Sequence, residues 1–481
     1  MQGDAIWSPV HDRGRSKIYL LMSTPPLADP ASGGQYWLRS GLLTLLEKGS
    51  GLVFALGTSV LLYRLLSQQR LGTWELFLIV TYFLEMGRSG LIQNGLIRFL
   101  AANRQEPTQY PAIMTASLAL NLGFSVVSNL ALWLLTGWLS RSYQAPELAV
   151  VLPVYFATNF VMAWFYHCNF VQQANFEFRG IFWSTFFFRG ALFGWVLYCW
   201  FMQMPVQLWQ LALASLAGAV VGAMVTWRFA RPYLHHAGTL DWVWIKKLLA
   251  FGKYVFGTNL STIFYKNIDK LILGKLLDPA AIAIYGVAGR ITQMVETPSF
   301  SIAAVVFPQS AARLERDGTA GIKWLYERSV GAILAIILPF VLLVLLFAEP
   351  MVWVFAGDKY LQSANLLRLT AFFGLFMPFA VQFGTILDST GRPATNFAYT
   401  LFTALLNLVL CYFFIRQIGL FGAAFATLTG YAVSFIFMQR LLRRDFDIRW
   451  WAAFGYVPEF YRLGFGLIKK KLQKASVQLK T

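Results

Sequence analysis

Charged residues are scarce in this chain of 481 residues: 13% are Asp, Glu, Lys or Arg, whereas 57% are hydrophobic. A soluble protein carries about 25% charged residues, so the composition excludes an ordinary soluble enzyme or binding domain. The mean hydropathy of +0.55 is instead typical of a polytopic membrane protein.

Cysteine and histidine are rare as well, with three and four residues. Cys168, Cys199 and Cys411 lie in or at the end of apolar segments, so we interpret them as packing residues. Their spacing predicts neither a disulfide framework nor a metal site. A phosphate-binding loop of the Gly-x-x-x-x-Gly-Lys-Ser/Thr type is also absent. We therefore expect no catalytic residues, no metal and no cofactor, and we do not expect an enzyme.

Long apolar runs are what this sequence has in abundance. Runs of about 20 apolar residues predict twelve transmembrane helices, in the ranges 41–63, 74–99, 112–139, 148–170, 181–202, 208–227, 251–277, 280–307, 330–347, 366–387, 397–415 and 420–438. Leu62–Leu66 resembles Leu273–Leu277, and both segments end the first helix of a half. We expect an all-α polytopic membrane protein with two six-helix bundles related by a pseudo-twofold axis along the membrane normal.

The basic residues predict the topology and account for the net charge of +18. With a cytoplasmic N-terminus, the inside segments hold 27 of the 40 basic residues and the spans hold 7. The outside loops hold only 6, namely Arg64, Arg70, Arg141, Lys275, Lys359 and Arg416. This asymmetry follows the positive-inside rule, so we expect cytoplasmic termini and no nucleic-acid partner.

The predicted spans divide the chain into five parts: a cytoplasmic N-terminal extension (1–40), an N-lobe (41–227), a linker (228–250), a C-lobe (251–440) and a basic cytoplasmic tail (441–481). In the linker, basic residues alternate with Trp242 and Trp244. This pattern favours an interfacial helix on the cytoplasmic leaflet, and a plain linker with topogenic charge is equally compatible with it. The tail is expected to bind anionic membrane lipids.

Charged residues inside the predicted spans indicate a functional site. The basic ones are Lys48, Arg88, Arg189, Lys266, Lys270, Arg290 and Arg368, and the acidic ones are Glu47, Glu85, Asp269 and Glu296. A charge at the middle of the bilayer costs roughly 2.5–3.5 kcal/mol, so these side chains should face a protein interior or a wet cavity. Seven cations against four anions predict an interior with a surplus of positive charge, which an anionic substrate would neutralise.

The densest group of these charges lies in the span 251–277. At 100° per residue, Lys266, Asp269 and Lys270 share one helix face with Asn259 and Thr262. The spacing predicts that Asp269 pairs with Lys266. The same spacing predicts an ion pair between Glu85 and Arg88 in the second span.

Arginine suits phosphate because its planar fork holds two oxygens at once. The candidate substrate-binding residues are therefore Lys266, Asp269, Lys270, Arg290, Arg88, Arg189 and Lys48. Candidate ion-coupling residues are Asp269, Glu85 and Glu296. The alternative is that these residues form structural ion pairs or extend from helix ends to the interface, which applies most to Lys48, Arg189 and Arg368.

The segment Asn267–Leu277, followed by Ile284–Ala288 and Arg290, resembles the seventh and eighth helices of polysaccharide transporter family flippases. This family belongs to the multidrug/oligosaccharidyl-lipid/polysaccharide exporter superfamily. Phe307-Pro308 and Gly391-Arg392-Pro393 resemble the family at two further helix ends, and the similarity covers about residues 41–440. The chain departs from some relatives in its N-terminal extension and in having twelve predicted spans where lipid II flippases have fourteen.

The resemblance implies a flippase that moves an undecaprenyl-diphosphate-linked oligosaccharide from the cytoplasmic to the outer leaflet by alternating access. It would act in the bacterial inner membrane, for O-antigen, capsule or exopolysaccharide synthesis, alongside a glycan polymerase and glycosyltransferases. The first alternative is a cation-coupled multidrug antiporter of the same architecture, which favours an acidic cavity. The second is a membrane enzyme of the glycan pathway, such as a ligase or polymerase, which the short outside loops disfavour.

Overall fold

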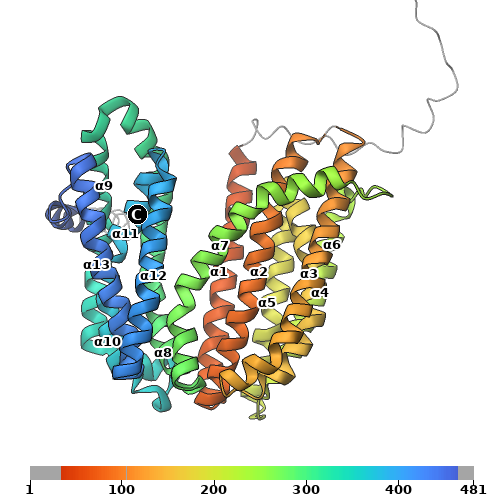
Figure 1. The fold of residues 1–481 in the computed structure, drawn as a ribbon, viewed down its shortest axis with the longest axis horizontal. Helices are drawn as coiled ribbons and strands as arrows, with labels where there is room; N and C mark the ends of the chain where they lie inside the picture. The colour runs from red at the N-terminus through yellow and green to blue at the C-terminus, as the bar shows by residue number, and fades with distance from the viewer. Residues whose placement is uncertain (1–33, 105, 464–481) are drawn as a thin grey trace, which may run out of the picture.

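The computed structural model describes residues 34–104 and 106–463, and nearly all of them are helical. Figure 1 shows two bundles of helices that meet at one end of the molecule, the closed end, and diverge at the other, the open end. The predictions made for residues 1–33 and 464–481 lie outside the described residues. The all-α, two-bundle architecture expected from the apolar runs is confirmed.

The N-lobe is built from six helices: α1 (Gly34–Leu65), α2 (Gln68–Ala102), α3 (Gln109–Ser142), α4 (Leu148–Ala174), α5 (Phe178–Phe201) and α6 (Leu208–Ala230). Local sequence explains where they begin. The Ser67 hydroxyl accepts the backbone N–H of Arg70 and caps α2, and the Glu177 side chain caps α5 by accepting the N–H of Arg179. These caps satisfy N–H groups that have no partner within the helix.

The C-lobe contains α7 (Trp242–Leu276), α8 (Pro279–Thr292), α9 (Glu296–Ala356), α10 (Ser363–Ala371), α11 (Met377–Ser389), α12 (Pro393–Ile418) and α13 (Leu420–Phe446). A last helical stretch, residues 452–463, packs on the outside of this lobe. Asp278 caps α8, and Pro279 occupies its first turn, where a missing N–H costs nothing.

Two predicted spans of the C-lobe are broken helices. The span 280–307 consists of α8 and the start of α9, joined by a short 3-10 helix at Gln293–Val295. The span 366–387 consists of α10 and α11, joined by a similar turn at Phe372–Leu375. The helix α9 itself changes direction at Gly318, whose φ of 63° is readily adopted only by glycine.

The predicted linker 228–250 is only partly a linker. Helix α7 begins at Trp242, where Asp241 caps it, and continues unbroken to Leu276. Trp244, Ile245 and Leu248 are buried against α2 and α3, so residues 242–250 continue α7 and do not form a separate helix. The position of this segment at the cytoplasmic leaflet stays a prediction.

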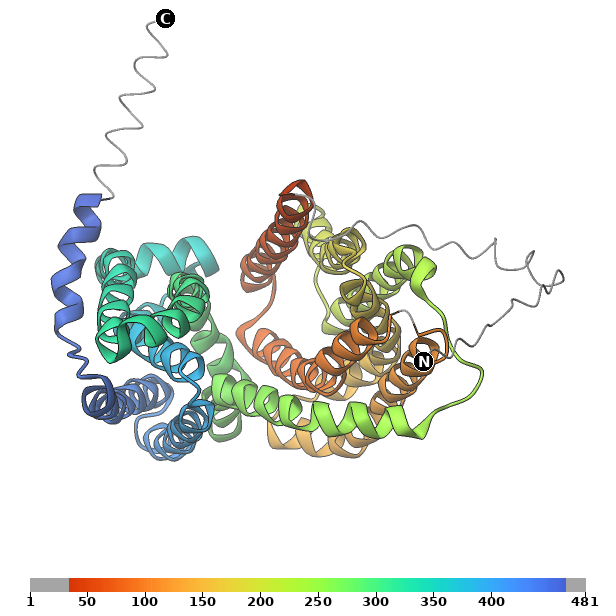
Figure 2. The same cartoon turned by 90° about the horizontal axis from the view of Figure 1, so that it is seen from above.

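Helix α7 joins the two lobes along one side. Its first half packs on α2, where Gly252 allows so close an approach that a Cβ would lie 1.8 Å from the Leu91 carbonyl oxygen. Its second half packs against α8 and α12. Figure 2, viewed from the open end, shows α7 running beside both bundles.

At the closed end, the two lobes share one apolar core. Leu62 and Tyr63 of α1 pack with Ile284 of α8 and with Tyr360, which follows α9. Gly72 of α2 touches the start of α8, and a Cβ there would lie 1.6 Å from the Pro279 carbonyl oxygen. The other buried clusters lie within one bundle or join α7 to the N-lobe. The lobes can therefore diverge toward the open end.

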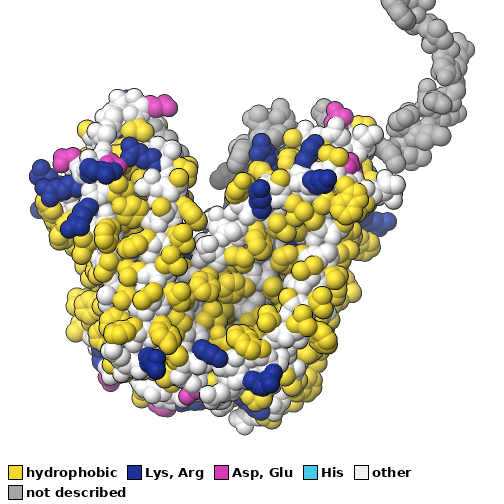
Figure 3. Space-filling model, viewed as in Figure 1, with side chains coloured by type: hydrophobic (Ala, Val, Ile, Leu, Met, Phe, Trp, Pro, Cys, Tyr) yellow, Lys and Arg dark blue, Asp and Glu magenta, His cyan; other side chains and the backbone are white. Residues whose placement is uncertain are grey.

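The molecular surface is that of a membrane protein. Figure 3 shows a wide band of hydrophobic side chains, with Lys and Arg gathered above and below it. Eight helical stretches of the described residues are long and apolar enough to cross a membrane. Helices α1, α2 and α7 are not among these eight, and α8 and the start of α9 are each shorter than a full span.

Candidate functional site

The cavity between the lobes has a volume of about 910 Å³ and is the candidate site. Small-molecule sites in proteins typically span about 300–1,000 Å³. Helices α1, α2 and α5 of the N-lobe line it on one side, and α7, α8, α12 and α13 of the C-lobe line it on the other. A ligand bound there would therefore contact both lobes.

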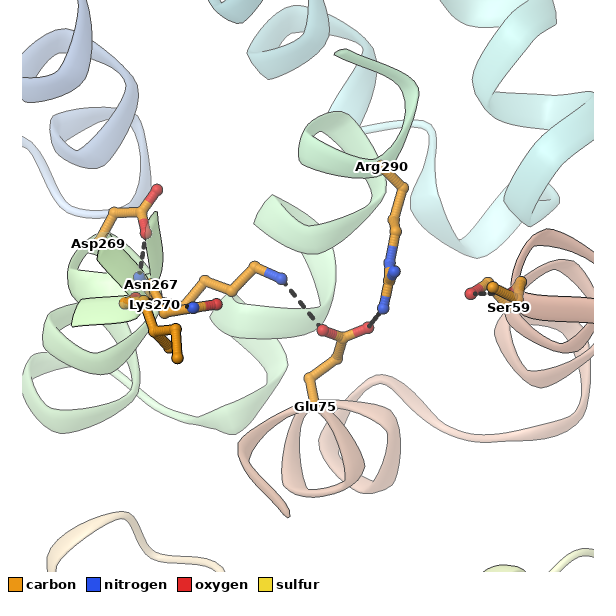
Figure 4. Close-up of polar contacts among 8 residues, drawn as sticks. Ser59, Glu75, Asn267, Asp269, Lys270 and Arg290 are labelled. Atoms are coloured by element: carbon orange, nitrogen blue, oxygen red, sulfur yellow. Dashed lines mark hydrogen bonds and ion pairs between the residues drawn. The ribbon is translucent and has the colours of Figure 1, made fainter. Parts of the chain in front are cut away.

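Near the closed end of the cavity, Glu75 bridges the two lobes. This α2 carboxylate lies 3.1 Å from the Lys270 Nζ atom of α7 and 3.3 Å from an Nη atom of Arg290 of α8. Figure 4 shows the three side chains converging on one point. The side chain of Glu75 is 7% exposed, and those of Lys270 and Arg290 are 15% and 27% exposed.

This cluster carries one more positive than negative charge. Two cations share a single carboxylate, and the buried Nε atom of Arg290 has no hydrogen-bond partner among the described residues. A partly buried cation without its own counter-ion is costly, because little water compensates its charge. Lys270 and Arg290 are therefore the candidate residues for binding an anion in this cavity.

Lys266 and Asp269 line the same cavity, but they do not pair with each other. Lys266 reaches across to Glu296 of α9, with 3.2 Å between Nζ and the carboxylate. The carboxylate of Asp269 accepts the backbone N–H of Lys270 at 2.8 Å. The predicted Lys266–Asp269 ion pair is thus wrong, because a carboxylate on a neighbouring helix competes for the lysine.

Arg88 was predicted to line the cavity and lies inside the N-lobe instead. It is 1% exposed and donates to the Ser125 hydroxyl at 2.8 Å and to the backbone and side-chain oxygens of Asn159. Glu85 does line the cavity and accepts the Tyr166 hydroxyl at 3.1 Å. The predicted Glu85–Arg88 ion pair does not form, because polar groups of α3 and α4 hold the guanidinium.

Three further predicted cations have different positions. Arg189 of α5 lines the cavity. Lys48 lies outside it, with a side chain that is 76% exposed and 3.2 Å from Glu47. Arg368 is also outside the cavity lining, where it pairs with Glu349 at 3.0 Å. The last two fit the alternative of structural or interfacial cations, so the placement of Lys48 in the binding site is wrong.

Among the described residues that line the cavity, positive and negative charges are equal in number. The basic residues are Arg189, Lys266, Lys270 and Arg290, and the acidic residues are Glu75, Glu85, Asp269 and Glu296. The expected surplus of positive charge is therefore wrong for the cavity as a whole and holds only for the Glu75 cluster. Glu75 was not among the four expected anions, although it falls within the predicted span 74–99. Its place inside that span was the signal that could have revealed it.

Solved structures show what kind of fold this is. The lipid II flippase MurJ, in an inward closed conformation, matches with a TM-score of 0.70 and 12% identity, over 88% of this chain and 92% of that one. A multidrug resistance transporter of the MATE family, in an inward-facing conformation, matches with a TM-score of 0.68 and 15% identity, over 83% and 98%. The chain therefore has the fold that these two proteins share.

The particular family follows from the sequence. The model of the polysaccharide biosynthesis protein family matches residues 61–365, and the chain belongs to this family. This confirms the family resemblance of α7 and α8, and the apolar helices agree with a multi-pass membrane protein.

Two curated relatives match part of the chain. An uncharacterized membrane protein of Methanocaldococcus jannaschii is 25% identical over 240 residues, which is 49% of this chain and 47% of that protein. A probable low-salt glycan biosynthesis flippase, Agl15 of Haloferax volcanii, is 22% identical over 204 residues, or 42% and 43%. The chain therefore matches less than half the length of either relative.

Proposed function

We propose that this protein is a flippase that moves a lipid-diphosphate-linked oligosaccharide from the cytoplasmic to the outer leaflet by alternating access. The observation that carries the proposal is that Lys270 and Arg290 share one carboxylate, Glu75, at the floor of a cavity between two lobes. Family membership and the flippase among the relatives support the class of cargo. A glycan polymerase and glycosyltransferases are the expected partners in the same pathway.

A diphosphate suits this site because it brings several negatively charged oxygens to two adjacent cations. It would compete with Glu75 for Lys270 and for Arg290, whose guanidinium can hold two oxygens at once. Because Glu75 belongs to α2 and its two partners belong to α7 and α8, displacing it also weakens a contact between the lobes. Binding of the cargo would thereby favour separation of the closed end.

The charge distribution supports an orientation with the open end in the cytoplasm. The six basic residues of the predicted outside loops lie at or next to the helix ends that meet at the closed end, whereas the connections and helix termini at the open end hold most of the others. In this orientation the structure is open to the cytoplasm, the side from which cargo would enter. The membrane would be the bacterial inner membrane, with both termini in the cytoplasm.

Transport of this kind needs an energy source. Glu85, Asp269 and Glu296 line the cavity and are candidates for binding a coupling ion. The membrane potential is an alternative source, since moving one charge across it contributes about 2.3 kcal/mol per 100 mV.

The test is a leaflet assay in proteoliposomes that contain a polyprenyl-diphosphate oligosaccharide labelled on its sugar. Wild-type protein should expose the label on the opposite leaflet, and Lys270→Met and Arg290→Met should each reduce the rate at least tenfold. Lys253→Met is the matched control, because Lys253 is an exposed cation of α7 outside the cavity lining. Unchanged rates in both cavity variants would refute the site, and no movement by wild type would refute the function.

A second candidate function is a cation-coupled drug antiporter. Two observations support it, namely the balanced charges of the cavity and the likeness to a multidrug resistance transporter. This candidate predicts that purified protein exchanges ethidium for protons or Na⁺ in proteoliposomes. Ethidium exchange without movement of the glycolipid would replace the first proposal with the second.

A further inference from the structure

Two helices that line the cavity from different lobes, α2 and α12, present chemically different faces to it. On the N-lobe side, α2 presents mainly apolar and aromatic residues, including Leu71, Trp74, Phe77 and Leu78. On the C-lobe side, α12 presents a row of uncharged polar residues at helical spacing, namely Asn396, Thr400, Thr403 and Asn407. Residues three and four apart lie on one face of a helix, so this row forms a continuous polar stripe along α12.

Helix α13 widens the stripe. Tyr431 and Ser434 line the cavity from this helix, and the Ser434 and Thr403 hydroxyls lie 2.9 Å apart. The ring of Tyr431 is stacked on that of Phe373, with centroids 5.5 Å apart and an angle of 17° between the planes. Both rings line the cavity. The stripe thus combines hydroxyl and amide groups with a flat aromatic surface.

We propose that the polar stripe of α12 and α13, defined as Asn396, Thr400, Thr403, Asn407, Tyr431 and Ser434, is the subsite for the neutral sugar rings of the cargo. This inference rests on the proposed function and extends it. The anionic part of the cargo binds at Lys270 and Arg290, and the stripe recognises the glycan that is attached to it.

The hydrogen-bonding capacity of the stripe suits sugar hydroxyls. Thr400 donates its hydroxyl proton to the Asn396 carbonyl at 2.9 Å, and Thr403 can donate to the Tyr399 carbonyl at the same distance. Each hydroxyl oxygen keeps lone pairs that can accept a further proton. Among the described residues, the Asn407 side-chain oxygen accepts a hydrogen bond from the weak donor Cys411, at 3.7 Å. Hydroxyl and amide groups that accept and donate hydrogen bonds at regular intervals along a helix suit the hydroxyl groups of successive sugar rings.

Other occupants fit the stripe less well. An acyl chain would cover its polar groups without replacing their hydrogen bonds, at a cost for each group. All six members are uncharged, and the carboxylate that contacts the stripe, Asp388, already accepts the Asn396 amide at 3.0 Å, so an organic cation would have to compete for it. Sugar rings combine hydroxyl edges with an apolar face, which can rest on Tyr431 and Phe373.

The position of the stripe agrees with a single extended cargo. From Asn396 to Asn407 it covers twelve residues of helix, and the eleven steps between them amount to about 16 Å at 1.5 Å per residue. Helix α12 begins at the open end and ends at the closed end, so the stripe extends toward the open end from the middle of the helix. Cargo anchored at the closed end of the cavity could therefore lay several sugar rings along it.

The experiment compares two lipids that share the polyprenyl diphosphate and carry either the complete oligosaccharide or its first sugar alone. We expect Thr400→Val/Tyr431→Phe and Thr400→Val/Thr403→Val/Asn407→Leu to slow flipping of the long glycan roughly tenfold or more, since each removes two or three hydrogen-bonding groups. The single-sugar lipid should change less than twofold. Lys270→Met should slow both lipids alike.

Two controls and a direct binding measurement complete the test. Thr136→Val and Tyr198→Phe make the same chemical changes outside the cavity lining and should alter neither lipid. Binding of free maltotetraose, cellotetraose and mannotetraose is measured with purified wild type and the double variant. Weaker binding of a tetrasaccharide by the variant would support the stripe even if wild type moved neither lipid, which would refute only the proposed function. Equal slowing of both lipids, or no tetrasaccharide binding together with unchanged flipping, would overturn the inference.

Discussion

The carboxylate of Glu75 lies 3.3 Å from the guanidinium of Arg290 although 215 positions separate them in the sequence. The contact joins α2 of the N-lobe to α8 of the C-lobe at the floor of the cavity. Since Lys270 approaches the same carboxylate at 3.1 Å, one acidic residue holds two cations that would otherwise be free to bind an anion.

The first prediction concerns Glu75→Gln, which keeps the shape of the side chain and removes its charge. Two neighbouring cations then lose their common counter-ion, so purified protein should bind inorganic pyrophosphate roughly tenfold more tightly. The free energy of this tenfold change is a modest part of the interaction energy between two charges at this distance. Isothermal titration calorimetry measures the change. Glu349→Gln is the control, because Glu349 pairs with Arg368 outside the cavity. Weaker pyrophosphate binding by Glu75→Gln would show that Glu75 does not compete with the anion.

The second prediction separates Arg88 from the binding site. Arg88→Ala leaves a cavity in the N-lobe and removes the guanidinium that bonds Ser125 and Asn159. The free energy of unfolding should fall by about 2–4 kcal/mol, with unchanged affinity for pyrophosphate. Thermal unfolding in detergent checks stability, with the exposed Arg98→Ala as control. Normal stability combined with lost binding would return Arg88 to the site.

The third prediction concerns the closed end. The Lys359 ammonium donates to the backbone oxygens of Arg64 and Leu66 at 2.9 and 2.8 Å, which ties the end of α9 to the connection between α1 and α2. Lys359→Met should open this end more often, because both hydrogen bonds are lost. Gly289 lines the cavity. A cysteine introduced there should react with an impermeant maleimide, added on the side of the closed end, several-fold faster in Lys359→Met than in the protein that keeps Lys359.

The control for this experiment is Arg416→Met. Arg416 lies at the same end of the molecule, and its hydrogen bond is to Tyr412 of its own helix. The native cysteines are buried and free, so they should contribute little labelling. Equal labelling of Lys359→Met and Arg416→Met would mean that Lys359 does not hold the closed end together.

The fourth prediction uses the tightest contact between the lobes. A Cβ at position 72 would overlap the Pro279 carbonyl, so Gly72→Ala must push α2 away from α8. Flipping should slow at least tenfold, because the closed end can no longer form the tight contact between α2 and α8. Gly194→Ala on α5 is the control, since a Cβ there meets no atom within 4 Å. Wild-type flipping by Gly72→Ala would show that this contact opens without consequence.

Individual residues show how far sequence reasoning reaches into the site. Lys266, Lys270 and Arg290 could be predicted to line a cavity, because lone cations in a membrane span have few other places to go. Their partners could not be predicted. Spacing along one helix suggested Asp269 for Lys266, whereas the structure supplies Glu296. Pairing within a helix is local, and the stronger contacts in this protein come from other helices.

The sequence by itself determined that the chain is an all-α membrane protein with two halves, because apolar runs of membrane length and the distribution of basic residues are properties of the chain alone. Only the tertiary structure decided which charges meet. It moved Arg88 into the N-lobe, left Lys48 outside the cavity and brought Glu75 between Lys270 and Arg290. The reason is physical. The free energy of inserting a charged side chain into the membrane depends on the residue itself, whereas the partner that offsets this free energy depends on how helices distant in sequence pack around the charge.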